Sequence, residues 1–153
     1  MYTSEAKETG IRQKDLAVAL FGTRAFARVL VVDDDPVTGQ LLASIGEREG
    51  YHVVSVDDGR KAYRMLKSDA DFTAAVFNMT MPNLNGVDIV RYMKTEKRLM
   101  RIPVVIVAGD HGLRLISDSF AAGALAFLPK PFTTDKLART IRLAIGSGRP
   151  RPA

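Results

Sequence analysis

The stretch Val29-Leu30-Val31-Val32-Asp33-Asp34-Asp35-Pro36 decides how this chain folds. Its apolar, β-branched half is too short for a surface helix and is typical of a strand that is buried on both faces. Pro36 suits the first turn of a following helix, where its missing N–H is not needed. The three acids therefore lie at the carboxyl end of a buried strand, where open α/β sheets place their binding sites. An aspartate in such a turn also serves as a helix N-cap, and three acids alone do not separate the two roles.

Strand-like and helix-like segments alternate five times along the chain. Short apolar runs occur at residues 29–32, 51–56, 74–77, 102–107 and 124–128, and apolar residues recur at helical spacing at 36–49, 61–67, 87–97, 113–122 and 133–145. Strands that alternate with helices in this way pair in parallel through right-handed crossovers. We therefore expect an α/β fold with a five-stranded parallel, doubly wound sheet and five flanking helices.

The chain divides into three regions. Residues 1–27 form an N-terminal extension, residues 28–146 form the α/β domain, and residues 147–153 form a tail rich in Gly, Pro and Arg that is expected to be disordered. In the extension, Leu16 and Leu20 recur at helical spacing beside Phe21, which predicts a short apolar helix. Such a helix must be covered by its own domain or by a second copy. We expect it to mediate homodimerisation through these three residues.

Composition narrows the class of protein. The 153 residues contain no cysteine, which excludes disulfides and thiolate metal sites. No apolar run reaches transmembrane length and the start is too polar for a signal peptide, so we expect a cytoplasmic protein without membrane contact. The net charge is +5, but no dense basic stripe with interleaved aromatic residues is visible in the sequence. We therefore expect no direct binding of nucleic acid.

Polar residues follow the first, third, fourth and fifth strands, whose carboxyl ends share one edge of such a sheet. Acids beside a lysine in one crevice would form a polar site, and the Lys130-Pro131 bond next to it is a candidate cis peptide. The residues brought to this edge are Asp33 and Asp34, Asn78 and Thr80, Ala108 and Gly109, and Lys130.

At this point the chain resembles the receiver domains of two-component response regulators, from about Arg28 to Ile145. The resemblance rests on three motifs in the family's order and spacing: Val31-Val32-Asp33-Asp34-Asp35-Pro36, Met81-Pro82-Asn83-Leu84-Asn85-Gly86 and Lys130-Pro131-Phe132. Each motif alone carries little information, whereas the three together are specific. The resemblance implies the strand order 2-1-3-4-5 and a role in phosphorelay signal transduction with a sensor histidine kinase.

The resemblance also implies roles for single residues. In the family, an aspartate at the end of the third strand accepts a phosphoryl group beside a bound Mg²⁺. Asp33 and Asp34 take the positions of the acid pair that holds the metal, with Asp34 as the favoured direct ligand and the backbone carbonyl of Thr80 as a further one. Lys130 takes the phosphoryl-binding position, and Phe127 takes the position of the aromatic switch residue.

Two positions depart from the family pattern. Asn78 stands at the phosphoacceptor position, and an amide cannot form the acyl phosphate that a carboxylate forms. Ala108 stands where the family has a Thr or Ser whose hydroxyl contacts the phosphoryl group. Losing one carboxylate also weakens a site for a hard cation. We therefore expect that no cofactor is required and that any Mg²⁺ binding is weak.

The amide at position 78 has a structural consequence of its own. It can donate a hydrogen bond to Asp33 or Asp34. Lys130 can then neutralise the pocket without a metal ion. We expect the fold to be stable in metal-free solution.

Three interpretations of Asn78 follow from the sequence. The first is a naturally degenerate pseudo-receiver that stands alone, is not an enzyme, and acts through contacts with a sensor kinase or another signalling protein. The second is a working phosphoacceptor in which an engineer replaced the aspartate, although Ala108 would then be an unneeded second change. The third is slow deamidation of Asn78. A small phosphatase or nucleotide-binding enzyme on the same fold is disfavoured, because no Gly-rich phosphate loop follows the first strand and the third strand ends without a carboxylate nucleophile.

Overall fold

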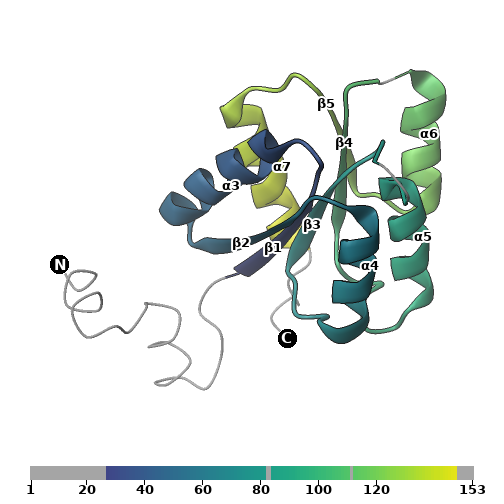
Figure 1. Ribbon diagram of the computed structural model, residues 1–153. Coiled ribbons are helices and arrows are strands. Elements are labelled where there is room, and N and C mark those ends of the chain that lie inside the picture. Colours follow the sequence, from purple (N-terminus) through teal and green to yellow (C-terminus); the bar gives the residue numbers. More distant parts are fainter. Residues whose placement is uncertain (1–26, 82–83, 111, 148–153) are drawn as a thin grey trace.

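The computed structural model describes residues 27–81, 84–110 and 112–147 of the chain (Figure 1). Leu16, Leu20 and Phe21 of the predicted apolar helix lie outside these ranges, as does the tail from residue 148 onward. Within the described ranges no helix is both long and apolar enough to cross a membrane.

Strands and helices alternate throughout the described part of the chain. The order is β1 (Ala27–Val32), α3 (Pro36–Glu49), β2 (Tyr51–Val56), α4 (Gly59–Ser68), β3 (Ala74–Asn78), α5 (Gly86–Thr95), β4 (Val104–Ala108), α6 (Leu113–Ala122), β5 (Ala126–Pro129) and α7 (Thr134–Ser147). The strands form one parallel five-stranded sheet in the order β2-β1-β3-β4-β5. The predicted fold class and strand order are therefore confirmed.

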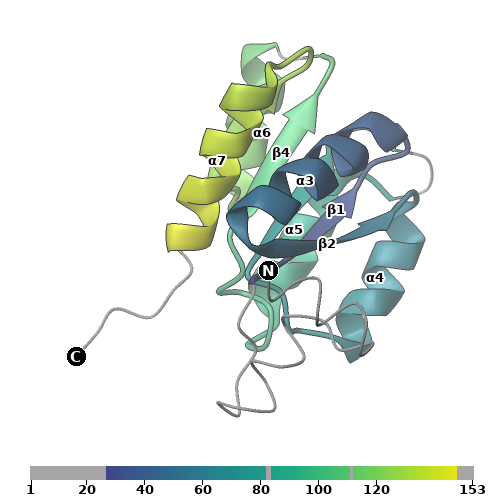
Figure 2. The ribbon, with the colours of Figure 1, turned by 90° about the vertical axis from the view of Figure 1, so that its left-hand side faces the viewer.

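The helices cover both faces of the sheet (Figure 1). Helices α3 and α7 lie side by side on one face, and Figure 2 shows them in front of the strands. Helices α4, α5 and α6 lie on the other face. Because the strands are parallel, their carboxyl ends meet at one open edge of the sheet. The polar residues of the sequence motifs lie at this edge.

The side chains of the central strands alternate between two apolar cores. Val29 and Val31 of β1 pack under α3 and α7, whereas Leu30 and Val32 pack under α4, α5 and α6. All four are at most 1% exposed. This explains why the decisive stretch of sequence is apolar at every position rather than at every second one.

Two strands begin later than the sequence pattern predicts. Strand β4 begins at Val104 because Ile102 still belongs to a turn and Pro103 has no N–H to donate to a neighbouring strand. Strand β5 begins at Ala126 because the N–H of Ala124 still bonds to the last turn of α6. Residues 102 and 124 are buried all the same, so apolar character alone could not separate strand from turn there.

Other element ends also differ from the expected boundaries, by one or two residues. Ala27 already pairs with Tyr51, so β1 takes one residue that was assigned to the extension. Helix α7 continues to Ser147. Helix α5 ends at Thr95 rather than at residue 97, because Glu96 adopts an extended backbone with φ −108°.

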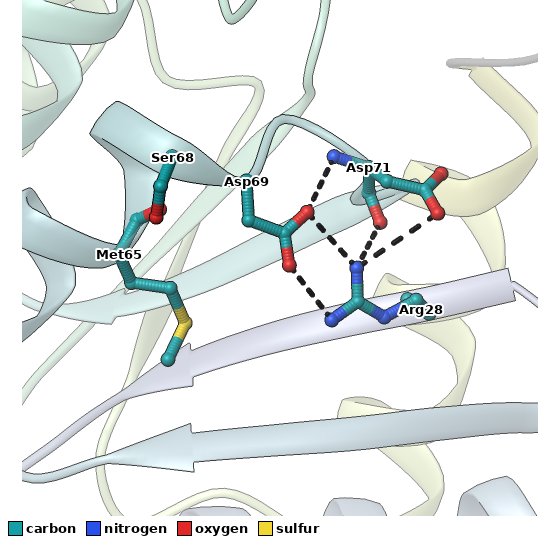
Figure 3. Close-up of polar contacts among 5 residues, drawn as sticks. All are labelled: Arg28, Met65, Ser68, Asp69 and Asp71. Carbon is teal, nitrogen blue, oxygen red and sulfur yellow. Dashed lines mark hydrogen bonds and ion pairs between the residues drawn. The ribbon is translucent and has the colours of Figure 1, made fainter.

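Arg28 ties the amino end of β1 to the loop that connects α4 with β3 (Figure 3). Its guanidinium donates to both carboxylate oxygens of Asp69, at 3.2 and 3.0 Å, and to the backbone carbonyl of Asp71 at 2.7 Å. It also lies 4.4 Å from the centre of the Phe72 ring, a cation–π contact. The Arg28 side chain is only 14% exposed. Lysine could not replace Arg28 here, because an ammonium group lacks the planar fork that bonds to a carboxylate and stacks on an aromatic ring at the same time.

We predict that Arg28→Met lowers the free energy of unfolding by about 2 kcal/mol, because it leaves the carboxylate of Asp69 without its charged donor. Arg139→Met is the matched control: Arg139 forms an exposed pair with Asp135, and its loss should cost less than about 0.5 kcal/mol. Urea unfolding followed by circular dichroism measures both. Equal stabilities of the two variants would show that the Arg28 contacts contribute nothing beyond a surface ion pair.

Candidate functional site

Asp33 is a buried carboxylate that is fully bonded. Its side chain is 1% exposed and follows directly on β1. One oxygen accepts from the backbone N–H of Asp35 at 3.0 Å. The other accepts from the Thr38 hydroxyl at 2.9 Å and from the Lys130 ammonium at 2.8 Å. Both carboxylate oxygens of Asp33 are therefore bonded to protein groups.

Lys130 reaches Asp33 from the far end of the described chain. It follows β5, and its backbone N–H bonds to the carbonyl of Ala108 at 2.8 Å, which continues the pairing of β5 with β4. The Lys130–Pro131 peptide is cis. The side chain is 21% exposed and forms an ion pair across the open edge of the sheet. Lys130 thus neutralises Asp33 directly.

Asn78 ends β3 and is 9% exposed. Its amide nitrogen donates to a carboxylate oxygen of Asp34 at 3.1 Å and to the backbone carbonyl of Thr80 at 3.0 Å. Both neighbours can only accept, so the nitrogen of the amide, and not its oxygen, has to face them. Each of the two amide hydrogens has a partner, and the amide nitrogen lies between the two oxygens.

The structure therefore separates the roles of the two acids. Asp33 is buried and paired with Lys130, whereas Asp34 is exposed and bonded to Asn78. Asp35, the third acid, caps α3 by accepting from the N–H of Val37 at 3.0 Å. The helix-capping role that the sequence left open thus belongs to Asp35 alone.

The donor set at this edge fits a divalent cation poorly. Mg²⁺ requires several oxygen ligands, preferably carboxylates, in octahedral geometry. Of the oxygens that the resemblance assigns to it, one carboxylate oxygen of Asp34 and the carbonyl oxygen of Thr80 accept from the Asn78 amide, and both oxygens of Asp33 are bonded elsewhere. Within the described ranges no group of three or more His, Cys, Asp or Glu side chains is arranged to hold a metal ion. A cation at these two oxygens would compete with the Asn78 amide for them.

Ala108 and Phe127 lie on the face of the sheet that α4, α5 and α6 cover. Ala108 is 2% exposed and ends β4. Phe127 is half-buried beside Ile106 and packs against the same apolar core. Ala108 carries a methyl group and no hydroxyl, so its side chain offers no donor to an anionic ligand.

A cleft of about 720 Å³ opens beside the acids, between α3 and β2. Gly39 on α3 allows the two elements to approach, because a Cβ there would lie 2.5 Å from the Ser55 hydroxyl oxygen. Asp57 and Lys61 line the cleft as an ion pair of 2.9 Å. Their hydrogen bond and mutual attraction lower the pKa of Asp57 and raise the pKa of Lys61.

Sequence reasoning missed Thr38 and the pair of Asp57 with Lys61. Thr38 lies in the first turn of α3, and only its rotamer reveals that its hydroxyl meets Asp33. Asp57 and Lys61 stand four residues apart, a spacing that is common to many surface pairs.

Comparison with known proteins gives a consistent result. The family model described as "Response regulator receiver domain" matches residues 29–142. Chemotaxis protein CheY1 of Helicobacter pylori is 26% identical over 121 residues, which cover 78% of this chain and 98% of that protein. Two-component response regulator ORR11 of Oryza sativa is 30% identical over 124 residues, which cover 81% of this chain and 84% of that protein.

Solved structures agree with these relatives. The receiver domain of a signal transduction histidine kinase from Syntrophus aciditrophicus superposes with a TM-score of 0.73 at 26% identity, over 83% of this chain and 96% of that one. The receiver domain of the sensor histidine kinase PA1611 from Pseudomonas aeruginosa gives 0.70 at 25% identity, over 80% and 99%. That structure has a magnesium ion coordinated in its active site cleft.

We predict that Mg²⁺ hardly stabilises this protein. A ligand at ten times its dissociation constant adds about 1.4 kcal/mol, or about 4 °C in Tm for a domain of this size. Because the Asn78 amide already bonds to oxygens that the cation would need, we expect Mg²⁺ at 10 mM to remain below its dissociation constant. The melting temperature in 10 mM MgCl₂ should then differ from that in EDTA by less than about 1 °C. Differential scanning calorimetry measures both.

The matched variant is Asn78→Asp, which replaces the amide donor with a third carboxylate. Its melting temperature should be lower than that of the parent in EDTA, because like charges then repel, and should rise with Mg²⁺. A Mg²⁺-dependent rise of about 4 °C or more in the parent protein would show that the amide does not block the cation.

Proposed function

This chain belongs to the response regulator receiver domain family, and we propose that it is a pseudo-receiver, which signals through protein–protein contacts without accepting a phosphoryl group. The observation that carries the proposal is the amide of Asn78, bonded to Asp34 and Thr80 at the position where the family has its phosphoacceptor. The lone pair of an amide nitrogen is delocalised into the carbonyl group, so the side chain of Asn78 has no nitrogen electron pair to offer a phosphorus atom. Nucleophilic transfer of this type requires a carboxylate.

Ala108 supports the same proposal from a second strand. A phosphoryl group at the end of β3 would meet a methyl group there instead of a hydroxyl donor. Lys130, the cation that would bind a phosphoryl oxygen, is engaged with Asp33 at 2.8 Å. Both the acceptance and the recognition of a phosphoryl group would therefore be impaired. The two functions depend on Asn78 and Ala108, which lie thirty positions apart in the sequence.

The alternatives explain less of the site. Replacement of one aspartate by an engineer accounts for Asn78 but not for Ala108. Slow deamidation of Asn78 would restore the acid but would leave the hydroxyl missing. A phosphatase on this fold would need a carboxylate nucleophile on β3, where Asn78 stands, and we assign the protein no catalytic activity and no required cofactor.

The partner class follows from the family. Two of the similar structures are receiver domains of sensor histidine kinases, and other relatives are chemotaxis proteins. We propose that this protein binds a sensor histidine kinase or another signalling protein, in the cytoplasmic setting expected from its composition. The partner would recognise the fixed shape of the receiver rather than a change in its phosphorylation.

We predict that a small-molecule phosphodonor such as acetyl phosphate, with Mg²⁺, leaves the intact mass of this protein unchanged. The variant Asn78→Asp should gain one phosphoryl group, because it regains the carboxylate nucleophile, and Asn78→Asp/Ala108→Thr should gain it to a greater extent. The control Asn78→Ala should gain none. A phosphoryl adduct on the parent protein would refute the proposal, and no adduct on either aspartate variant would show that the pocket has lost more than these two groups.

We also propose that the N-terminal extension joins two copies of the chain. Leu16, Leu20 and Phe21 lie outside the described residues, and the support is their apolar character at helical spacing.

We predict that Leu16→Ser/Leu20→Ser/Phe21→Ser converts a dimer into a monomer in multi-angle light scattering. The matched control is Leu143→Ser, which changes an apolar residue of α7 that is 66% exposed and should leave the mass unchanged. A parent protein that runs as a monomer, or a triple variant that remains dimeric, would contradict this interface.

A further inference from the structure

Helix α4 carries four basic residues and no acidic one: Arg60, Lys61, Arg64 and Lys67. Two of them, Arg60 and Lys61, lie in its first turn, where the helix dipole disfavours positive charge. The N-cap Asp58 compensates in part, since its carboxylate accepts from the backbone N–H of Arg60 at 2.6 Å. This charge pattern is not one that helix stability would select. A local conflict of this kind indicates a use outside the fold itself.

Four residues of α4 form one stripe. Arg60, Tyr63, Arg64 and Lys67 follow the i, i+3, i+4, i+7 spacing of a single helix face. Ala62 and Leu66, which are fully buried, turn the opposite side of the helix toward the sheet. The stripe therefore points away from the core.

Aromatic side chains extend this stripe toward α5. The rings of Tyr63 and Tyr92 meet edge to face, with centroids 4.7 Å apart, and the Lys67 ammonium lies 5.0 Å from the centre of the Tyr63 ring. Both tyrosines are half-buried, so their rings are fixed while part of each remains accessible. Helices α4 and α5 lie next to each other on this side of the molecule (Figure 1). We call the surface of Arg60, Tyr63, Arg64, Lys67 and Tyr92 the basic face.

The acids that border the basic face are already engaged. Asp57 pairs with Lys61 at 2.9 Å, and Asp88 of α5 pairs with Arg91 at 3.5 Å. Asp69, beyond the end of α4, is bonded to Arg28. Arg60 and Arg64 have no ion-pair partner among the residues that the structure describes. Two guanidinium groups, one turn apart, remain available beside a rigid aromatic pair.

We propose that the basic face is a docking surface for an acidic amphipathic helix of a partner protein. Carboxylates one turn apart on that helix would match Arg60 and Arg64, since the i, i+4 spacing is about 6 Å on both. Arginine forks bind carboxylates with two parallel hydrogen bonds. An apolar residue between the carboxylates would rest on Tyr63 and Tyr92, which lose little entropy because their rings are already packed.

A carboxylate-bearing helix fits this face better than a nucleic acid does. Arg60 and Arg64 cover only one helical turn, whereas the phosphates of a nucleic-acid strand would extend beyond both ends of this pair. Such a strand would meet Asp57 and Asp58 at the amino end of α4 and Asp88 on α5. The basic face includes none of Asp34, Asn78 and Lys130, so the binding of a helix there does not require phosphorylation.

The probe is a labelled helical peptide of about 21 residues with the repeat Glu-Ala-Ala-Leu-Glu-Ala-Ala, and its matched form has glutamine in place of every glutamate. We expect the full-length protein to bind the glutamate peptide in fluorescence anisotropy and to bind the glutamine peptide at least about tenfold more weakly. Amide chemical-shift changes should concentrate in residues 59–68 and 86–95. Arg60→Gln/Arg64→Gln should weaken binding of the glutamate peptide at least about tenfold.

The control Arg114→Gln/Lys136→Gln removes the same charge from exposed positions on α6 and α7 and should change the affinity less than about twofold. If both double variants weakened binding of the glutamate peptide equally, the effect would be one of net charge alone, and the proposal would be wrong. Equal binding of the two peptides, or shifts that map elsewhere, would overturn it as well. Tighter binding of a single-stranded oligonucleotide of about 20 nucleotides, lost in Arg60→Gln/Arg64→Gln, would replace the acidic helix with nucleic acid.

Discussion

A carboxylate buried at the end of a parallel strand has to be neutralised, and the rest of this site depends on how Asp33 meets that requirement. The ammonium of Lys130, the hydroxyl of Thr38 and a backbone N–H surround it, so its charge is balanced by the protein. Asp34, at the surface, then needs only one neutral donor, which the Asn78 amide supplies. Lys130 balances the charge of Asp33, while the Asn78 amide gives Asp34 a hydrogen bond but no opposite charge.

Much of this arrangement could be predicted from the sequence. Residues 29–36 alone indicated a buried strand, a turn of acids and a following helix, and the alternation of later segments gave the parallel sheet. The gathering of Asp33, Asn78 and Lys130 at one edge follows from parallel topology. Strand beginnings at Val104 and Ala126 could not be predicted, because Ile102 and Ala124 are buried in turns and look like strand residues. The different roles of Asp33 and Asp34 could not be predicted either, because they depend on the rotamers of the side chains.

The basic face illustrates a different limit of sequence reasoning. In the sequence, Tyr92 lies at least 25 residues from the other members of the basic face, and the overall charge gives no sign of a patch. Only the packing of α4 beside α5 brings the tyrosines into contact and shows which acids are already paired. Surface electrostatics is set by tertiary neighbours, so a count of charged residues along the chain says little about it.

The pairing of Asp33 with Lys130 also bears on how the protein is made. The two residues are separated by 97 positions, so at 5–20 residues per second a ribosome emits the aspartate about 5–20 s before its lysine. During that interval β1 cannot complete its environment, and Asp33 stays hydrated. The native contacts of Asp33 can therefore be completed only after β5 and Lys130 have left the ribosome. A chain truncated before residue 130 would lack the ammonium group that balances Asp33.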